Sequence, residues 1–179
     1  VGVVTAAGQY DRVAEAVEAG GLDDDLRRAL AAEAFFHTAS YDAAIVGWIG
    51  QDRVLPLRHF DDLRYGENPH QPGSIYVEDG ARPWWAEAKQ LQGKEMSFNN
   101  YLDANSALEL VKEYSGTAAV IIKHNNPCGV ATSSSLADAY RKARDCDPVS
   151  AFGGIIAFNH LVDHETAKEL TATFVEVVV

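Results

Sequence analysis

Residues 118–127 of the chain are Ala118-Ala119-Val120-Ile121-Ile122-Lys123-His124-Asn125-Asn126-Pro127. The five apolar residues that open this stretch are typical of a buried strand. A cation, an imidazole and two amides follow directly, and a turn is expected because Pro127 disfavours helix at the residue before it and has no backbone N–H to donate. Open α/β sheets bind ligands at the carboxyl ends of their strands. The stretch therefore predicts a sheet with a small-molecule site at its edge.

The segments around this stretch alternate between strand and helix patterns. Downstream, helices are expected at 103–114, from Ser133 or Ser134 to 144, and at 163–170 after an Asp163 cap, with further strands at 154–158 and 174–179. Upstream, the pattern predicts a strand at 1–4, helices at 10–19, 23–37 and 41–49, and a strand at 75–77. Strands that alternate with helices of about ten residues predict the α/β class, as layers of α-β-α with a mainly parallel sheet.

Prolines and glycines interrupt regular structure between Gln51 and Gly73. A domain boundary is predicted there, dividing residues 1–53 from residues 54–179. The chain lacks an initiator Met and ends on a strand-like run, so both ends are expected to be cut from a longer protein.

The formal net charge of -11 over 179 residues argues against a nucleic-acid or membrane-surface binder, since no basic patch could dominate such a field. No apolar run is long enough to span a bilayer. The two cysteines form no disulfide framework, which favours an intracellular, cytoplasmic enzyme.

Lys123 and His124 together offer the groups that acyl or formyl transfer to an amine requires. A histidine can accept a proton near neutrality, and a lysine can stabilise negative charge that develops on an oxygen. Neighbouring residues of a regular strand point to opposite faces, so both can serve one substrate only if the strand ends or twists there. The alternative is a surface lysine beside a core histidine, but the position at a strand end favours the functional interpretation.

Three further blocks carry polar side chains in loop-like contexts. The loop at 64–71 contains Arg64, which suits a phosphate, and Tyr65, which can stack on a heterocycle, although it could also be a polar linker. The Asn99-Asn100 pair suits hydroxyl or amide recognition, or helix capping. Gly153-Gly154 lets a ligand approach the backbone closely, or forms a common turn.

A metal site is the sharpest alternative to this chemistry. Pro127-Cys128 matches half of the Pro-Cys-x-x-Cys motif of zinc deaminases, but Ala131 stands where the second cysteine is needed and the chain has no His-x-Glu. His160 and His164 have a spacing that can bind metal on a helix, yet Asp163 is better explained as a helix cap. No metal is therefore expected, and Cys128 is interpreted as a packed residue at a helix start.

The blocks at 64–71, 123–129 and 147–154, in this order and spacing, closely resemble the bifunctional purine biosynthesis family that joins IMP cyclohydrolase to AICAR transformylase. The resemblance implies that residues 27–42 belong to the final helices of the cyclohydrolase domain. It also implies that residues from about 54 begin a transformylase domain with a deaminase-like fold that lacks the zinc.

That resemblance implies transfer of a formyl group from the co-substrate 10-formyltetrahydrofolate to the 5-amino group of AICAR, in a parent enzyme that also closes the formylated product to IMP. His124 would accept the proton of the amine and Lys123 would stabilise the transition state. The nucleotide would be held by Arg64, Tyr65, Asn100 and Gly153.

The family's sites form across a homodimer, and its cyclohydrolase residues and most of its folate pocket would lie outside residues 1–179. The isolated chain is therefore expected to be inactive. A non-catalytic nucleotide-binding module, a zinc-dependent deaminase and a structural fragment remain the alternatives.

Overall fold

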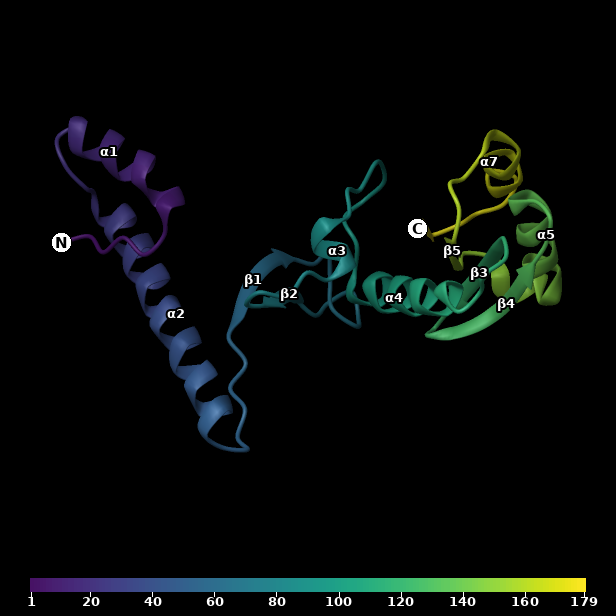
Figure 1. Ribbon diagram of the computed structural model, residues 1–179. Coiled ribbons are helices and arrows are strands. Elements are labelled where there is room, and N and C mark those ends of the chain that lie inside the picture. Colours follow the sequence, from purple (N-terminus) through teal and green to yellow (C-terminus); the bar gives the residue numbers. More distant parts are fainter. The chain divides into compact units, whose positions relative to one another are not determined.

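The computed structural model describes all 179 residues (Figure 1). Their contacts divide the chain into two units. The first unit contains residues 1–61 and 75–89, and the second contains residues 62–74 and 90–179. Every residue predicted for the site belongs to the second unit.

The first unit is built around one long helix. Its elements are η1 (Ala7–Gln9), α1 (Tyr10–Glu18), α2 (Asp24–Ile49), α3 (Trp84–Glu87) and most of the strand pair β1 (Leu57–Asp62) and β2 (Ser74–Glu78). Asp23 caps α2 by accepting a hydrogen bond from the Leu26 backbone N–H at 2.7 Å. The two helices expected at 23–37 and 41–49 are one helix, because α2 runs without a break from Asp24 to Ile49. The strand expected at 1–4 is wrong, because these residues form no ladder.

None of the helices is both long and apolar enough to cross a membrane, and this includes the 26-residue α2.

The prediction missed β1 because all six of its residues are exposed, so no alternation of apolar and polar residues marks it.

The second unit contains a four-stranded sheet in the order β4-β3-β5-β6. The strands are β3 (Ala118–Lys123), β4 (Asn126–Thr132), β5 (Ile155–Phe158) and β6 (Val177–Val178). β3 runs antiparallel to both β4 and β5, and only β5 and β6 are parallel. The α/β class is confirmed, but the mainly parallel sheet is wrong. The cause is local: the chain reverses immediately after β3 through a two-residue loop, which can only join antiparallel strands.

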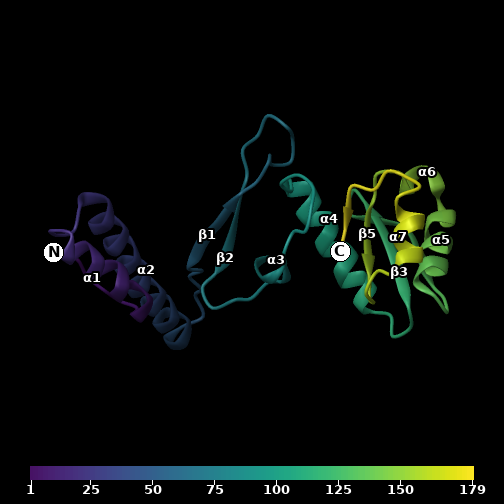
Figure 2. The same cartoon turned by 90° about the horizontal axis from the view of Figure 1, so that it is seen from above.

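Helices lie on both sides of this sheet. Figure 2 shows α4 (Phe98–Lys112) on one side and α5 (Leu136–Cys146) and α7 (His164–Leu170) on the other, with the short α6 (Pro148–Ala151) next to α5. Ala119 and Ile121 of β3 pack in the core cluster with Tyr140 of α5 and Leu170 of α7. Because strand side chains alternate, the equally buried Val120 and Ile122 point to the opposite face, where α4 lies.

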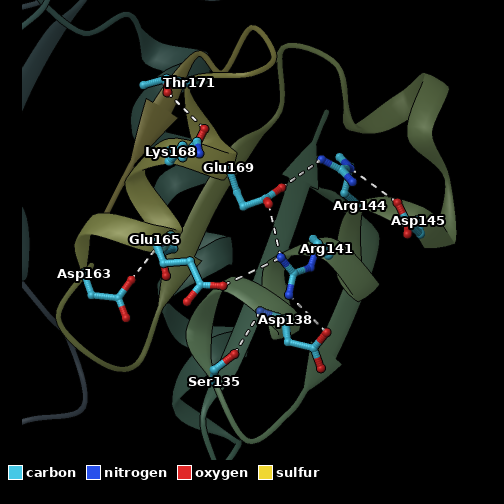
Figure 3. Close-up of polar contacts among 11 residues, drawn as sticks. Ser135, Asp138, Arg141, Arg144, Asp145, Asp163, Glu165, Lys168, Glu169 and Thr171 are labelled. Carbon is cyan, nitrogen blue, oxygen red and sulfur yellow. Dashed lines mark hydrogen bonds and ion pairs between the residues drawn. The ribbon is translucent and has the colours of Figure 1, made fainter.

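Ion pairs join α5 to α7 at the surface of this layer (Figure 3). Arg141 reaches Glu169 at 3.1 Å and Glu165 at 3.9 Å, and Arg144 reaches the second oxygen of Glu169 at 3.8 Å. Single exposed pairs contribute only about 0–1 kcal/mol. Contacts shared around Arg141 and Glu169 therefore link the two helices at the surface and add little stability.

Asp138, at the start of α5, predicts a pH dependence of stability. A hydrogen bond from the Ser133 hydroxyl, followed by one from Lys142, lowers the pKa of its carboxyl to about 2. Since the folded pKa lies below the unfolded value of about 3.9, this stabilisation is complete above pH 4 and is lost as the pH falls through about 2. Asp138→Asn should be less stable than wild type at pH 7, and the difference should shrink between about pH 4 and pH 2.

Urea unfolding midpoints at pH 7, 4, 3 and 2 measure this difference. Asp145→Asn is the control, because Asp145 pairs with Arg144 and bonds neither Ser133 nor Lys142. A difference between wild type and Asp138→Asn that stays constant down to pH 2 would contradict the assignment.

Candidate functional site

The site begins at the hairpin between β3 and β4. Lys123 pairs with Asn126, so His124 and Asn125 form a two-residue loop, and both have positive φ angles, of 52° and 60°. Two such residues make a type I′ turn, whose twist matches that of the strands it joins. Histidine and asparagine occupy the left-handed region more often than most residues. The predicted turn is therefore real but begins earlier than expected, because Asn126, Pro127 and Cys128 already belong to β4.

Lys123 and His124 line the same cleft. Its volume is about 250 Å³, and its lining comes from the hairpin and from the start of α6: Lys123, His124, Asn126, Pro127, Cys128, Asp147 and Ser150. Because β3 ends at Lys123 and the chain turns at His124, the two side chains are not forced to opposite faces. The Lys123 ammonium donates to the Phe152 carbonyl oxygen at 2.7 Å, which fixes its position beside the cleft.

Asp103 of α4 holds the turn from the other side. Its Oδ2 accepts from the His124 N–H at 3.1 Å, and its Oδ1 accepts from the Asn125 N–H at 2.7 Å. Each left-handed residue costs about 1–2 kcal/mol, and hydrogen bonds to a charged acceptor contribute about 1.5–3 kcal/mol each. The carboxylate therefore offsets the backbone strain of the turn. Ser106, one helical turn further along α4, adds a hydrogen bond to the Asn125 side chain.

Asn100 lies one turn before Asp103 and connects α4 to Arg64. Its backbone N–H donates to the Ser97 hydroxyl oxygen at 3.3 Å and its Oδ1 accepts from the Ser97 backbone N–H at 3.0 Å, which closes a capping box. Arg64 Nη2 approaches Oδ1 of Asn100 at 3.5 Å. The structure thus bears out the capping role of Asn100, and it places this residue next to another predicted site residue.

Arg64 is half-buried and held by several groups. Its Nη2 donates to the Tyr65 hydroxyl at 3.2 Å, its guanidinium lies 4.8 Å from the centre of the Tyr65 ring, and Glu176 lies at 3.8 Å. Its Nε is buried without a hydrogen-bond partner. Backbone bonds to Met96 and Phe98 attach this segment to the start of α4. The 64–65 segment is therefore anchored to the site rather than being a free linker.

Gly153 and Gly154 bring a further backbone segment against β3. Gly153 has a φ of +70° and donates to the Phe174 carbonyl oxygen at 2.9 Å. A Cβ on Gly154 would lie 2.8 Å from Cγ2 of Ile121, so only glycine allows this approach. The glycines therefore serve packing here, and they leave the Phe152 carbonyl in reach of Lys123.

These contacts form a closed series. It passes from Lys123 to Phe152, along the chain to Gly154, and from the Gly154 carbonyl to the Glu176 N–H at 3.1 Å. Glu176 pairs with Arg64, and Arg64 meets Asn100 of α4. The series returns to the turn through Asp103 of the same helix. Five of the six predicted site residues lie on it, namely Arg64, Asn100, Lys123, His124 and Gly153, and Tyr65 contacts it through Arg64.

Two ionisable groups in the cleft have shifted pKa values. Burial raises the pKa of the Cys128 thiol, which keeps it neutral and unsuited to act as a nucleophile. It is packed against the core, as expected, but from a strand rather than a helix start. Hydrogen bonds from the Ser150 hydroxyl and backbone N–H lower the pKa of Asp147. No group of three or more His, Cys, Asp or Glu side chains is gathered as a metal site.

Two residues of the series escaped the sequence analysis. Asp103 follows Asn100 by three positions, a spacing that places both on one helix face and could have suggested a joint role. Glu176 lies in a strand-like run and carries no motif, so nothing in the sequence signals its approach to Arg64.

Known proteins resemble the chain over its whole length. The family described as "AICARFT/IMPCHase bienzyme" matches residues 1–179. The bifunctional purine biosynthesis protein PurH of Aquifex aeolicus is 52% identical over 180 residues, which cover 95% of this chain and 36% of that protein. The PurH proteins of Mesorhizobium japonicum and Parvibaculum lavamentivorans are each 49% identical over all of this chain and 36% of their own length.

The chain thus spans about a third of the length of the relatives it matches. The family model matches all residues, and the identities to these relatives are near one half. The chain belongs to the AICARFT/IMPCHase bienzyme family.

Proposed function

We propose that this chain supplies part of the AICAR transformylase site of a bifunctional purine biosynthesis enzyme. The observation that carries the proposal is the meeting of Lys123 and His124 on one cleft at the end of β3. A base beside an oxyanion stabiliser suits formyl transfer to an amine. The substrates would be AICAR and, as co-substrate, 10-formyltetrahydrofolate.

The reaction can be written with these side chains alone. The 5-amino nitrogen of AICAR attacks the formyl carbon, and the imidazole of His124 takes the proton that this nitrogen releases. The bond between the formyl carbon and folate N10 breaks, and N10 gains a proton as it leaves. Lys123 stabilises the negative charge on the formyl oxygen and passes a proton toward N10. The base matters because the amine is conjugated with its ring and carboxamide, which makes it a weak nucleophile.

Arg64, Tyr65, Asn100 and Gly153 would hold the nucleotide. The guanidinium of Arg64 is the group best suited to the phosphate, because it offers two parallel donors to a pair of oxygens. Its present partner Glu176 lies at 3.8 Å, a distance that a charged ligand can compete with.

Arg64→Met should therefore weaken AICAR binding by about 10–100-fold, the equivalent of one lost charge-assisted hydrogen bond of roughly 1.5–3 kcal/mol. Calorimetric titration of the full-length protein with AICAR measures the loss. Arg82→Met is the matched control, since the Arg82 side chain is 84% exposed and pairs with Glu87 at the surface. Equal affinities of Arg64→Met and wild type would remove Arg64 from the site.

The remaining assignments follow from the same proposal. Residues 1–53 would be the end of the cyclohydrolase domain and residues 54–179 the first part of the transformylase domain. The parent enzyme would also close the formylated product to IMP, and would act as a cytoplasmic homodimer. An assay of the full-length protein with AICAR and 10-formyltetrahydrofolate tests the proposal. AICAR binding without turnover would instead show a nucleotide-binding module.

A further inference from the structure

We propose that Asp103 is a positioning residue for formyl transfer, which fixes the backbone of His124 and thereby aims its imidazole into the cleft. This role rests on the proposed function of His124 as the base. The two oxygens of Asp103 accept from the N–H groups of His124 and Asn125, at 3.1 and 2.7 Å. Two successive N–H groups that converge on one anion form a backbone nest, here closed by a side chain of the same protein.

The turn needs such a partner because nothing else buries it. His124, Asn125 and Asn126 are exposed, and the first two hold φ angles that residues other than glycine seldom adopt. α4, by contrast, is rigidly seated, since Ala104 and Ala107 are fully buried against the sheet. Asp103 therefore ties the exposed loop to a helix whose own position is fixed by packing. A misplacement of about 1 Å can cost 10²-fold in rate.

The chemistry of the contact requires a carboxylate. An ionised aspartate offers acceptors on both oxygens, whereas an asparagine offers one oxygen and one NH₂ group. In Asp103→Asn, the NH₂ group would face one of the two backbone N–H donors. The side chain would keep its size and lose one of its two hydrogen bonds to the turn. This variant therefore separates the effect of the hydrogen bonds from that of packing.

The experiment compares Asp103→Asn with Glu109→Gln in the full-length protein. Glu109 is on the same helix, is 62% exposed and pairs with Lys112, so its change removes the same charge away from the turn. Three quantities are measured: kcat for formyl transfer, the Kd for AICAR, and amide hydrogen exchange of the peptide that contains residues 123–127. We expect Asp103→Asn to lower kcat by about 10–100-fold and to accelerate exchange of the turn, with a Kd for AICAR close to that of wild type. Glu109→Gln should match wild type in all three.

A second change separates positioning from a direct charge effect. Glycine adopts positive φ without strain, so Asn125→Gly in the Asp103→Asn background should restore part of the lost kcat. If Asp103 acted only through its charge on His124, the glycine would restore nothing, and the proposal would be wrong. If Asp103→Asn fails to fold, Asp103→Glu takes its place, since it keeps the charge but moves it by one methylene, and kcat should again fall at unchanged affinity for AICAR.

Other outcomes would also overturn the role. They are a kcat within a factor of about 3 of wild type in Asp103→Asn, or a loss of AICAR affinity that parallels the loss of kcat. The failure of the proposed function looks different, because wild-type protein would then bind AICAR without any formyl transfer. An exchange rate of the turn that does not respond to Asp103→Asn would refute the contact itself, whatever the activity.

Discussion

Replacing His124 should lower kcat for formyl transfer by about 10²–10⁴-fold, the contribution of a positioned general base. Cyclisation of the formylated nucleotide to IMP should continue at the wild-type rate, because His124 is assigned only to the transfer. Two variants of the full-length protein make the test. His124→Ala removes the imidazole, and His124→Asn also removes it but suits the positive φ of 52° at this position. Equal losses in both would show that the missing base, and not strain in the turn, causes the defect.

His160→Ala is the matched control for these variants. This histidine is exposed, contacts Asn159 and does not line the cleft of Lys123 and His124. Its loss should leave both activities unchanged. Formyl transfer that survives in His124→Asn, within about tenfold of wild type, would contradict the role of His124 as the base.

Gly129→Ala should produce the largest loss of stability from a single methyl group. A Cβ at this position would lie 1.8 Å from the carbonyl oxygen of Ala143 and 3.2 Å from Cβ of Cys146, so β4 and α5 could not keep their present separation. The clash is with backbone, which cannot rotate away as a side chain could. We expect the free energy of unfolding to fall by about 3 kcal/mol, the upper end of what overpacking costs.

Urea unfolding of Gly129→Ala and Gly116→Ala measures this effect against a control. Apart from Gly116 and its two chain neighbours, no heavy atom lies within 4 Å of a Cβ at this position, so that change should alter stability by less than about 1 kcal/mol. Equal stabilities of the two variants would contradict the close packing of β4 on α5. The same packing explains why the block at 123–129 ends on a glycine. Gly129 lies where β4 packs directly against α5.

Local signals in the sequence were sufficient for most of the sheet and helices. The apolar runs at 118–122 and 155–158 are the buried β3 and β5, and Asp163 caps α7 through the Thr166 N–H at 2.7 Å. Strand direction was predicted wrongly because it depends on the turn. The His124–Asn125 turn contains no glycine, and Pro127 placed the expected reversal too late. β6 covers only Val177–Val178 of the run expected at 174–179.

The candidate site was foreseen in part. Lys123 and His124 could be predicted to share a site because they are adjacent in the sequence. The structure places both on one cleft. The contact between Asp103 and His124 could not be foreseen, since Asp103 lies 21 residues before His124 and meets it only through the packing of α4 on the sheet. Glu176 reaches Arg64 by a similar long-range approach. The catalytic and nucleotide-binding roles themselves remain predictions.

A crystal structure of the full-length protein with bound AICAR tests the central claim most directly. The account predicts that the 5-amino nitrogen lies within about 3.2 Å of an imidazole nitrogen of His124, the reach of a general base, with the phosphate on the guanidinium of Arg64. An amine bound away from His124, with Lys123 still tied to the Phe152 carbonyl and taking no part, would contradict it.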